Sequence, residues 1–392
     1  MNKTSLDKYS LLAIVLVVAA LPLLWAIYAA PIWWVSLTAP NYPPESFPDG
    51  VRIHFHMNGV FNGCEKVEKA EIQEDEALDC VHEMDTINHY VGMYPIAAGG
   101  VIERALSPFL VSMLGVMLIG FAVPSAKTRM ILMAAGFAGI AAWMYLYFYG
   151  DDGLRYQNEG YLSALVTSMN QGGGDEIGGR KSVMSTGEAL IARLKAEMAE
   201  AEGRQPAEVM EQKTTSQKER LIDNLRETFE KSEERKPVAE REKWDGSGAQ
   251  MLGWHYEKSL GRYFNNPAEI KPMVEKMTLA ANVVFWALLA AMVLLVWGAR
   301  KSNGVFFRML ILVPIALPVF FIIDYSAWLW WYGHSLNEMG AFTVKPFMPT
   351  VFGDGKVAQF TTHSYPYTGF GLMVLMSAAL VVALIIRRRK AD

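Results

Sequence analysis

Residues 54–93 concentrate the side chains of this chain that could bind a soft metal ion. The stretch holds four of the seven histidines, both cysteines and three methionines. Thioether and thiolate ligands select Cu(I), imidazole suits copper or zinc, and carboxylate-rich sites suit harder ions. Because methionine contributes little to a zinc site, the set points first to copper. Its spacing is open, with no paired CxxC motif and no CxxCH motif for covalent haem attachment.

The segment VRIHFHM (51–57) alternates apolar and polar residues, as a half-buried strand does. Four apolar side chains would face one way: Val51, Ile53, Phe55 and Met57. Four polar ones would face the other: Arg52, His54, His56 and Asn58. The two histidines could share a metal ion, or they could simply be solvated on the open face. Asn58-Gly59 suits a tight turn after the strand, and Asn62-Gly63 repeats the signal.

The segment VHEMDTINHYVGM (81–93) adds further ligand types. If it is helical, His82 and His89 lie seven residues apart on one face, and His89 and Met93 four apart. Gly92 would more naturally end a helix. Each residue could instead be structural. The candidate metal ligands of the whole chain are His54, His56, Met57, His82, Met84, His89, Met93 and, from a later loop, His334.

Cys64 and Cys80 enclose a charged segment within the same stretch. In an oxidising compartment the two could form a disulfide, which would contribute roughly 3 kcal/mol by closing a loop of this size. A thiolate pair that binds Cu(I) and a pair of buried free thiols are the alternatives.

Six apolar runs must position these residues. A span takes about 20 residues, and the runs lie near 9–31, 106–124, 130–149, 278–298, 306–327 and 368–387. The first is too long for a signal-peptide core and is interpreted as an uncleaved helix. Pro22, Pro314 and Pro318 would kink their helices. With 52% hydrophobic residues and a net charge of −4, nothing favours nucleic-acid binding.

The short connections SAKTR (125–129) and GARKSNG (298–304) and both tails are basic, and short basic segments stay in the cytoplasm. The sequence therefore predicts an α-helical polytopic membrane protein of the bacterial inner membrane. It would have six transmembrane helices, both termini in the cytoplasm, and outer loops that include a small β-containing loop and a helical hairpin insert. All seven histidines would then lie outside the cytoplasm.

This topology divides the chain into alternating membrane and outer segments. They are the tail and first helix (1–31), the His/Met/Cys loop (32–105), the second and third helices (106–149), the charged helical insert (150–277), the fourth and fifth helices (278–327), an outer loop (328–367), and the last helix with its basic tail (368–392).

The insert contains two amphipathic patterns, at 185–203 and 217–231. The second pattern would place four apolar residues on one helix face: Leu221, Ile222, Leu225 and Phe229. His255 lies among aromatic residues and is interpreted as packing. Prolines and glycines in the outer loop 328–367 suggest an ordered coil.

Two segments, INHYVGM (87–93) and YGHSLN…VKPFMPTVFGDGKVAQF (332–360), are similar to motifs of a family. The chain resembles uncharacterised polytopic membrane proteins associated with nitrous oxide reductase gene clusters, which share N-H-Y-x-G-M before the second helix and Y-G-H-x-L followed by K-P-F-x-P before the last. The resemblance implies an accessory role, in copper delivery or in electron supply to a periplasmic copper enzyme. It directs attention to His89, Met93 and His334.

These observations favour a membrane accessory protein that handles Cu(I) at the periplasmic face, with a periplasmic cuproprotein or cytochrome as its partner. The alternative is a non-catalytic or electron-transfer subunit of a membrane complex. However, no histidine falls in a span, which argues against haem held by two histidines within the bilayer. A permease or an outer-face copper enzyme is a further alternative. The sequence leaves open whether loops 32–105 and 328–367 touch.

Overall fold

The computed structural model describes residues 8–40, 42–44, 47–64, 101–170, 217–260, 267–302, 304–335, 348–357 and 359–388. Several residues singled out by their sequence lie outside this part of the chain: Cys80, His82, Met84, His89 and Met93, together with the segment 185–203. The chain forms two compact units. One combines Met1–Tyr145 with Leu252–Asp392, and the other is Leu146–Met251.

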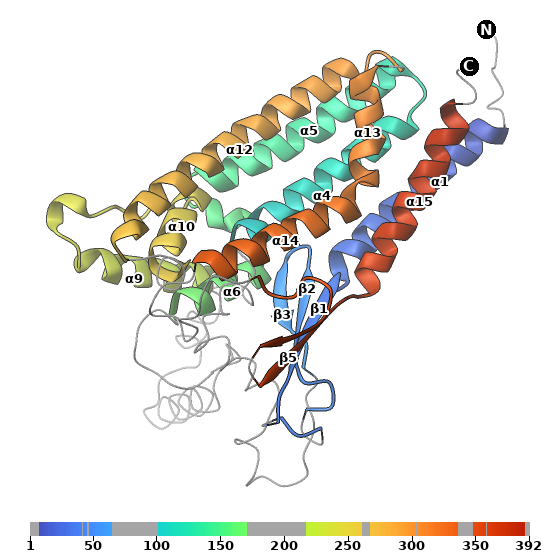
Figure 1. Cartoon of the computed structure of the whole chain (residues 1–392). Helices are drawn as coiled ribbons and strands as arrows, with labels where there is room; N and C mark the ends of the chain where they lie inside the picture. The colour runs from blue at the N-terminus through green and yellow to red at the C-terminus, as the bar shows by residue number, and fades with distance from the viewer. Residues whose placement is uncertain are drawn as a thin grey trace, which may run out of the picture. The chain divides into compact units, whose positions relative to one another are not determined.

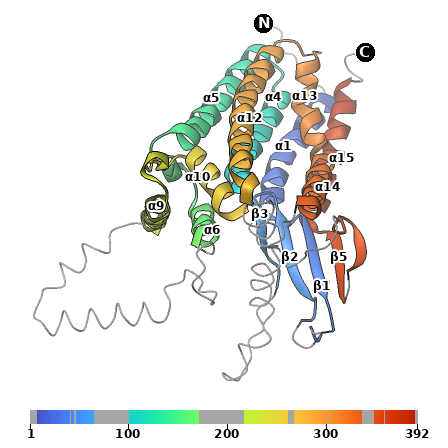
Figure 2. The ribbon, with the colours of Figure 1, turned by 60° about the vertical axis from the view of Figure 1, so that its left-hand side comes forward.

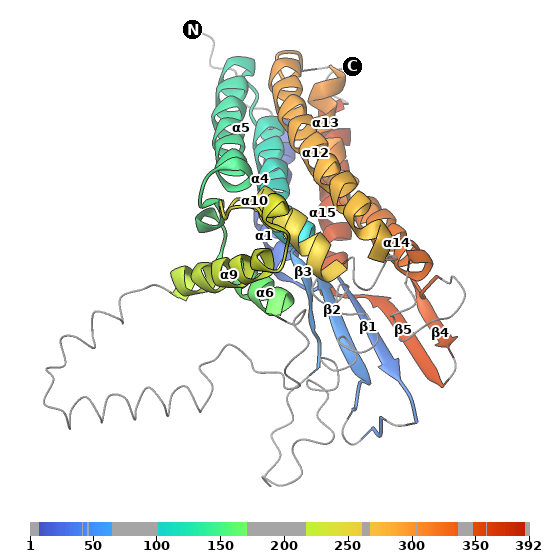
Figure 3. The same cartoon turned by 90° about the vertical axis from the view of Figure 1, so that its left-hand side faces the viewer.

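Long apolar helices dominate the first unit (Figure 1). Five described helices are long and apolar enough to cross a membrane, within α1 (Lys8–Ala29), α4 (Val101–Ala122), α5 (Ala126–Tyr149), α12 (Ile270–Gly298) and α15 (Thr368–Arg388). A sixth span results if the bent pair α13 (Val305–Ile315) and α14 (Leu317–Ser335) counts as one. The α4–α5 and α12–α13 connections lie at the end of this unit where α1 begins and α15 ends (Figures 1 and 3).

The bend between α13 and α14 is 63° and falls between two prolines. Pro314 lies in the last turn of α13, and Pro318 lies in the first turn of α14. Neither can donate the backbone hydrogen bond that would continue the helix, and each ring crowds the preceding turn. The sequence prediction of a kink here is confirmed, and its size divides the predicted run 306–327 into two helices.

A five-stranded antiparallel sheet in the order β3-β2-β1-β5-β4 extends from the bundle of this unit (Figures 2 and 3). Its strands are β1 (Trp33–Thr38), β2 (Val51–His56), β3 (Gly59–Asn62), β4 (Gly353–Val357) and β5 (Phe360–Pro366). The pairing of β1 with β5 joins the loops 32–105 and 328–367 into one sheet.

Two expectations about these loops were wrong in detail. Residues 353–366 form a β-hairpin and not a coil, because β1 offers the edge on which β5 pairs, a contact distant in sequence. The turn after β2 also lies one residue earlier than expected. His56 pairs with Gly59, so that Met57 and Asn58 form the turn and Gly59 opens β3.

One face of the sheet is buried in a hydrophobic core. Val51, Ile53 and Phe55 are 1%, 3% and 6% exposed, which confirms the predicted alternation. They pack with Trp33 of β1 and with Tyr325 and Leu329 of α14. Leu252 and Tyr256 complete this core. Burial of apolar surface stabilises a fold by about 25 cal/mol per Å², so the apolar side chains of β2 face the core. The alternation then leaves the opposite face of β2 for polar groups.

Gly50 allows the chain to enter β2 beside β1. Its φ is +69°, and a Cβ there would lie 2.5 Å from Ser36 Oγ and 2.6 Å from the carbonyl oxygen of Leu37. The Ser36 hydroxyl donates a hydrogen bond to the carbonyl of Asp49 in the same turn. Close packing and positive φ together therefore require glycine at this position.

We expect Gly50→Ala to lower the free energy of unfolding by about 2 kcal/mol more than Gly353→Ala. Gly353 also has a positive φ, of +90°, but a Cβ there would meet nothing within 4 Å of the described structure. The pair thus separates steric overlap from backbone strain. Chemical denaturation in detergent measures both variants. Equal losses would show that the overlap at Gly50 relaxes without cost.

The second unit contains η1 (Gly153–Tyr156), α6 (Glu159–Asn170), α9 (Gln217–Glu234) and η3 (Val238–Glu240). The helix predicted over 217–231 is confirmed, and its four predicted apolar residues, Leu221, Ile222, Leu225 and Phe229, are buried. The unit ends at Met251 within α10 (Gly248–His255). The region up to residue 277, with η4 (Tyr256–Leu260) and η5 (Pro267–Glu269), belongs to the first unit.

Candidate functional site

The face of the sheet opposite the core carries a row of polar and aromatic side chains. Directly opposed residues of antiparallel strands lie on one face. His54 opposes Trp34, which opposes Tyr365; Arg52 opposes Ser36, which opposes His363, which opposes Asp354. We call this the polar sheet face, with members Trp34, Ser36, Thr38, Arg52, His54, His56, Asp354, Thr361, His363 and Tyr365.

His54 is the member of this face with an unsatisfied ring nitrogen. Its ring stacks on Tyr367 with 5.3 Å between centroids. Its Nε2 atom is buried and has no hydrogen-bond partner among the described residues. Burial, and then the positive charge of Arg52, lower the pKa of the imidazole below its ordinary value. His54 is therefore neutral near pH 7 and can donate a lone pair to a metal ion, as metal binding requires.

The charge of Arg52 is itself held by two neighbouring groups. Its guanidinium lies 4.5 Å from the centre of the Trp34 ring, and its Nη2 is 3.2 Å from a carboxylate oxygen of Asp49. This arrangement directs the guanidinium toward the β1 side of the face. The carboxylate also offsets part of the repulsion that Arg52 would exert on a cation near His54.

The other described candidates have different surroundings. The ring of His56 packs edge-on against Phe61 at 4.9 Å, and Met57 lies in the turn that follows. The exposed ring of His334 stacks on Trp330 of its own helix at 4.5 Å, with Nδ1 2.7 Å from the Trp330 carbonyl oxygen. His54 and His56 share a face, as predicted, but each ring packs on its own aromatic partner.

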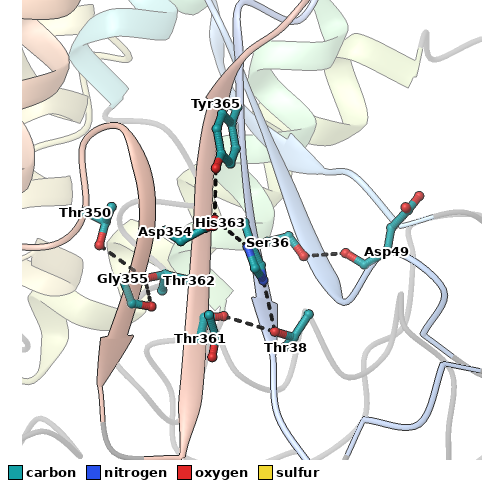
Figure 4. A network of polar contacts seen from close by, with 10 residues as sticks. All are labelled: Ser36, Thr38, Asp49, Thr350, Asp354, Gly355, Thr361, Thr362, His363 and Tyr365. Atoms are coloured by element: carbon teal, nitrogen blue, oxygen red, sulfur yellow. Dashed lines mark hydrogen bonds and ion pairs between the residues drawn. The ribbon is translucent and has the colours of Figure 1, made fainter.

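His363 was not among the selected metal ligands, and both of its ring nitrogens have hydrogen-bond partners (Figure 4). Its Nδ1 lies 2.7 Å from Asp354 Oδ1, and its Nε2 lies 3.1 Å from Thr38 Oγ1. The Tyr365 hydroxyl donates to the same Asp354 oxygen at 3.0 Å. These hydrogen bonds, first from His363 and then from Tyr365, lower the pKa of the Asp354 carboxyl.

Acyl-transfer sites align a hydroxyl, an imidazole and a carboxylate in this same order. Here Thr38, His363 and Asp354 come from β1, β5 and β4, so the line also ties the β4–β5 hairpin to β1. When the ring is neutral, Nδ1–H donates to Asp354 and the Thr38 hydroxyl donates to Nε2. When it is protonated, Nε2–H donates to Thr38, whose hydroxyl can turn to the Thr361 carbonyl at 3.4 Å. The line can therefore accept a proton without losing its contacts.

His54 and His363 do not belong to one metal site. They lie on β2 and β5 with β1 between them, and two strand spacings amount to about 10 Å. Two imidazoles on one ion lie much closer, since each metal–nitrogen bond is about 2 Å. Within the described ranges, no three His, Cys, Asp or Glu side chains form a group that could hold a metal ion.

Cys64 follows β3 and borders the core of the sheet. It is disulfide-bonded. The sequence contains one other cysteine, Cys80, which lies outside the described residues. The position of Gly63 beside His54 shows where the chain leaves the sheet. A Cβ on Gly63 would lie 2.9 Å from His54 Cδ2, so the backbone at Gly63 passes close to the unsatisfied imidazole.

No protein-family model, curated protein or solved structure matches this chain. The site is thus defined by its own geometry. Sequence reasoning did not select His363 as a metal ligand, and it missed the pairing of His363 with Asp354, because two glycines flank Asp354 and hide the strand pattern of β4. The alternating TTHSY of β5 was an available signal.

Proposed function

We propose that this protein handles copper at the outer face of the bacterial inner membrane, in the assembly of, or electron supply to, a periplasmic copper enzyme such as nitrous oxide reductase. In this proposal six spans cross the membrane and both termini lie in the cytoplasm. The apolar helices of the first unit support association with a bilayer. The sequence motifs that resemble the nitrous oxide reductase-associated family support the choice of enzyme.

The observation that carries the proposal is the buried Nε2 of the neutral His54, which has no hydrogen-bond partner in the described part of the chain and lies on the sheet that unites the two outer loops. A buried polar atom without a partner costs about 1–3 kcal/mol, so a ligand that pairs with it is favoured. Imidazole is a copper ligand. His54 would hold the ion together with ligands of the adjoining segment, of which His82, Met84, His89 and Met93 are the candidates.

The test compares copper retention in two matched variants of one sheet face. Detergent-purified protein is loaded anaerobically with Cu(I), desalted and analysed for metal. We expect wild type and His363→Gln to retain about one copper, because both ring nitrogens of His363 already have partners. We expect His54→Gln to retain several-fold less, and His89→Ala/Met93→Ala to lose copper too.

Wild-type protein without copper, or equal retention in His54→Gln and wild type, would contradict the proposed site. In the first case the alternative role, a non-catalytic or electron-transfer subunit, predicts a stable protein partner that co-purifies without metal. An affinity-tagged wild-type chain purified from a mild detergent extract measures that outcome directly.

A further inference from the structure

Two arginines lie at the end of the first unit where the short connections meet. Arg129 of α5 is 0% exposed. Its Nε donates to the carbonyl of Ala299 at 2.9 Å, its Nη1 to the carbonyl of Val123 at 3.2 Å, and its Nη2 to Ser302 Oγ at 3.2 Å. It thereby ties the α4–α5 connection to the α12–α13 connection. Arg387, in the last turn of α15, donates from Nη1 to the carbonyl of Phe121.

The two positive charges are near neighbours. The guanidinium carbons of Arg129 and Arg387 lie 4.5 and 4.8 Å from the centre of the same Phe307 ring. Arg387 also lies 4.6 Å from the centre of the Phe121 ring, which stacks on Phe307 at 5.2 Å. The aromatic pair fixes both guanidinium planes and supplies cation–π attraction. It supplies no negative charge.

Among the described residues, no carboxylate from the neighbouring sequence compensates these charges; Asp392, five positions after Arg387, lies outside them. Asp and Glu are absent from residues 104–150, 276–323 and 355–391. Within the described residues neither arginine forms an ion pair with an acidic side chain. The carbonyls that they contact belong to the C-terminal ends of α4 and α12, each equivalent to about half a negative charge. Among the described groups an excess of positive charge therefore remains.

Arg387 retains the donors to bind an anion. It makes one hydrogen bond among the described residues, so its remaining N–H groups have no partner there. The side chain of Arg387 is half-buried, and none of its unpaired nitrogens is buried. The remaining N–H groups are therefore accessible. A planar guanidinium with adjacent free donors matches the two oxygens of a phosphate.

We propose that Arg387, supported by Arg129, binds the phosphate of an anionic phospholipid at this end of the helices. The ends of membrane spans lie at the level of the headgroups, and basic sites between helices bind anionic headgroups. Free phosphate has the same oxyanion chemistry, and the experiment distinguishes the two sources. This inference concerns the end of the unit remote from His54 and does not depend on copper.

The test measures lipid binding to delipidated, detergent-purified full-length protein by native mass spectrometry. Phosphatidylglycerol is titrated against wild type, Arg387→Gln, Arg387→Lys and Arg300→Gln. Arg300 is the matched control, because it lies at the same end but packs on Trp297 and donates to the carbonyl of that residue. We expect Arg387→Gln to weaken binding about tenfold, Arg387→Lys to weaken it less, and Arg300→Gln to leave it unchanged.

A zwitterionic lipid, phosphatidylcholine, and inorganic phosphate are tested in parallel. We expect phosphatidylcholine to bind at least several-fold more weakly than phosphatidylglycerol. Millimolar inorganic phosphate could instead stabilise wild type but not Arg387→Gln, with no difference in binding between the two lipids. That result would show that the site binds a free anion and would overturn the lipid as its ligand. Equal lipid affinity for wild type and Arg387→Gln would overturn the site itself. Thermal unfolding of each variant without lipid separates loss of binding from loss of folding.

Discussion

Trp33→Ala is expected to lower the free energy of unfolding by about 4 kcal/mol, and Trp34→Ala by about 1 kcal/mol. The two tryptophans are adjacent in β1 but lie on opposite faces of the sheet. Trp33 is 2% exposed, and its ring contacts the rings of Phe321, Tyr325 and Phe370 at centroid distances of 6.0, 5.7 and 5.5 Å. Truncation would leave a large cavity where the sheet packs on α14 and α15.

A second loss adds to the cavity. The Trp33 Nε1–H donates to Ser364 Oγ at 2.9 Å, and Ser364 is 0% exposed. Trp33→Phe keeps an aromatic ring and removes this donor, so we expect it to cost about 1–2 kcal/mol. Trp34, in contrast, packs on Tyr365 and Arg52 on the polar sheet face.

Chemical denaturation in detergent, followed by circular dichroism, measures these three variants. If Trp34→Ala proved as destabilising as Trp33→Ala, the core would not lie on the Trp33 side of β1. If the proposed copper site exists, Trp33→Ala is also expected to lower copper retention, because it disturbs the sheet that positions His54. For stability, Trp34→Ala is the matched control, because it changes a tryptophan of the polar sheet face and leaves the core intact.

His255 is expected to make the protein less stable in acid. The ring is 3% exposed, and burial lowers its pKa to about 3. In the unfolded chain a histidine has a pKa of about 6.5. The unfolded state therefore binds the proton first as the pH falls, and stability decreases from about pH 6.5 down to about pH 3. One pKa unit is worth about 1.4 kcal/mol, so the total loss over these 3.5 units is about 5 kcal/mol.

His255→Gln removes the titrating group and keeps a polar side chain of similar reach. We expect the stability of this variant in detergent to fall less between pH 6.5 and pH 4.5 than that of wild type, by about 2–3 kcal/mol. His334→Gln, which changes an exposed histidine, is the matched control. The same pH dependence in wild type and His255→Gln would mean that His255 does not stay neutral in the folded protein.

The sequence located several elements well because their signals are local. Apolar runs long enough to span a bilayer predicted the long helices, and strict alternation from Val51 to Phe55 predicted which side chains of β2 are buried. The amphipathic spacing of Leu221, Ile222, Leu225 and Phe229 predicted α9 and its buried face. In each case neighbouring residues alone set the pattern.

Other features depended on partners far away in the chain. β4 carries two glycines around Asp354 and has no strand signal of its own, so it was expected to be coil. β5 becomes a strand because it pairs with β1, more than 300 residues earlier. The line of Thr38, His363 and Asp354 exists only after that pairing. The nearness of Arg129 and Arg387 likewise follows from the packing of α5 and α15 around Phe307.

The sequence by itself determined the apolar helices, the faces of β2 and α9, and the chemical types available for a metal site, because these follow from composition and periodicity. Tertiary structure alone decided that the loops 32–105 and 328–367 form one sheet. It also decided that His54 has a buried nitrogen without a hydrogen-bond partner among the described residues, while His363 has two partners. Hydrogen-bond satisfaction and burial are properties of packed groups, and residues distant in sequence supply the atoms that determine them.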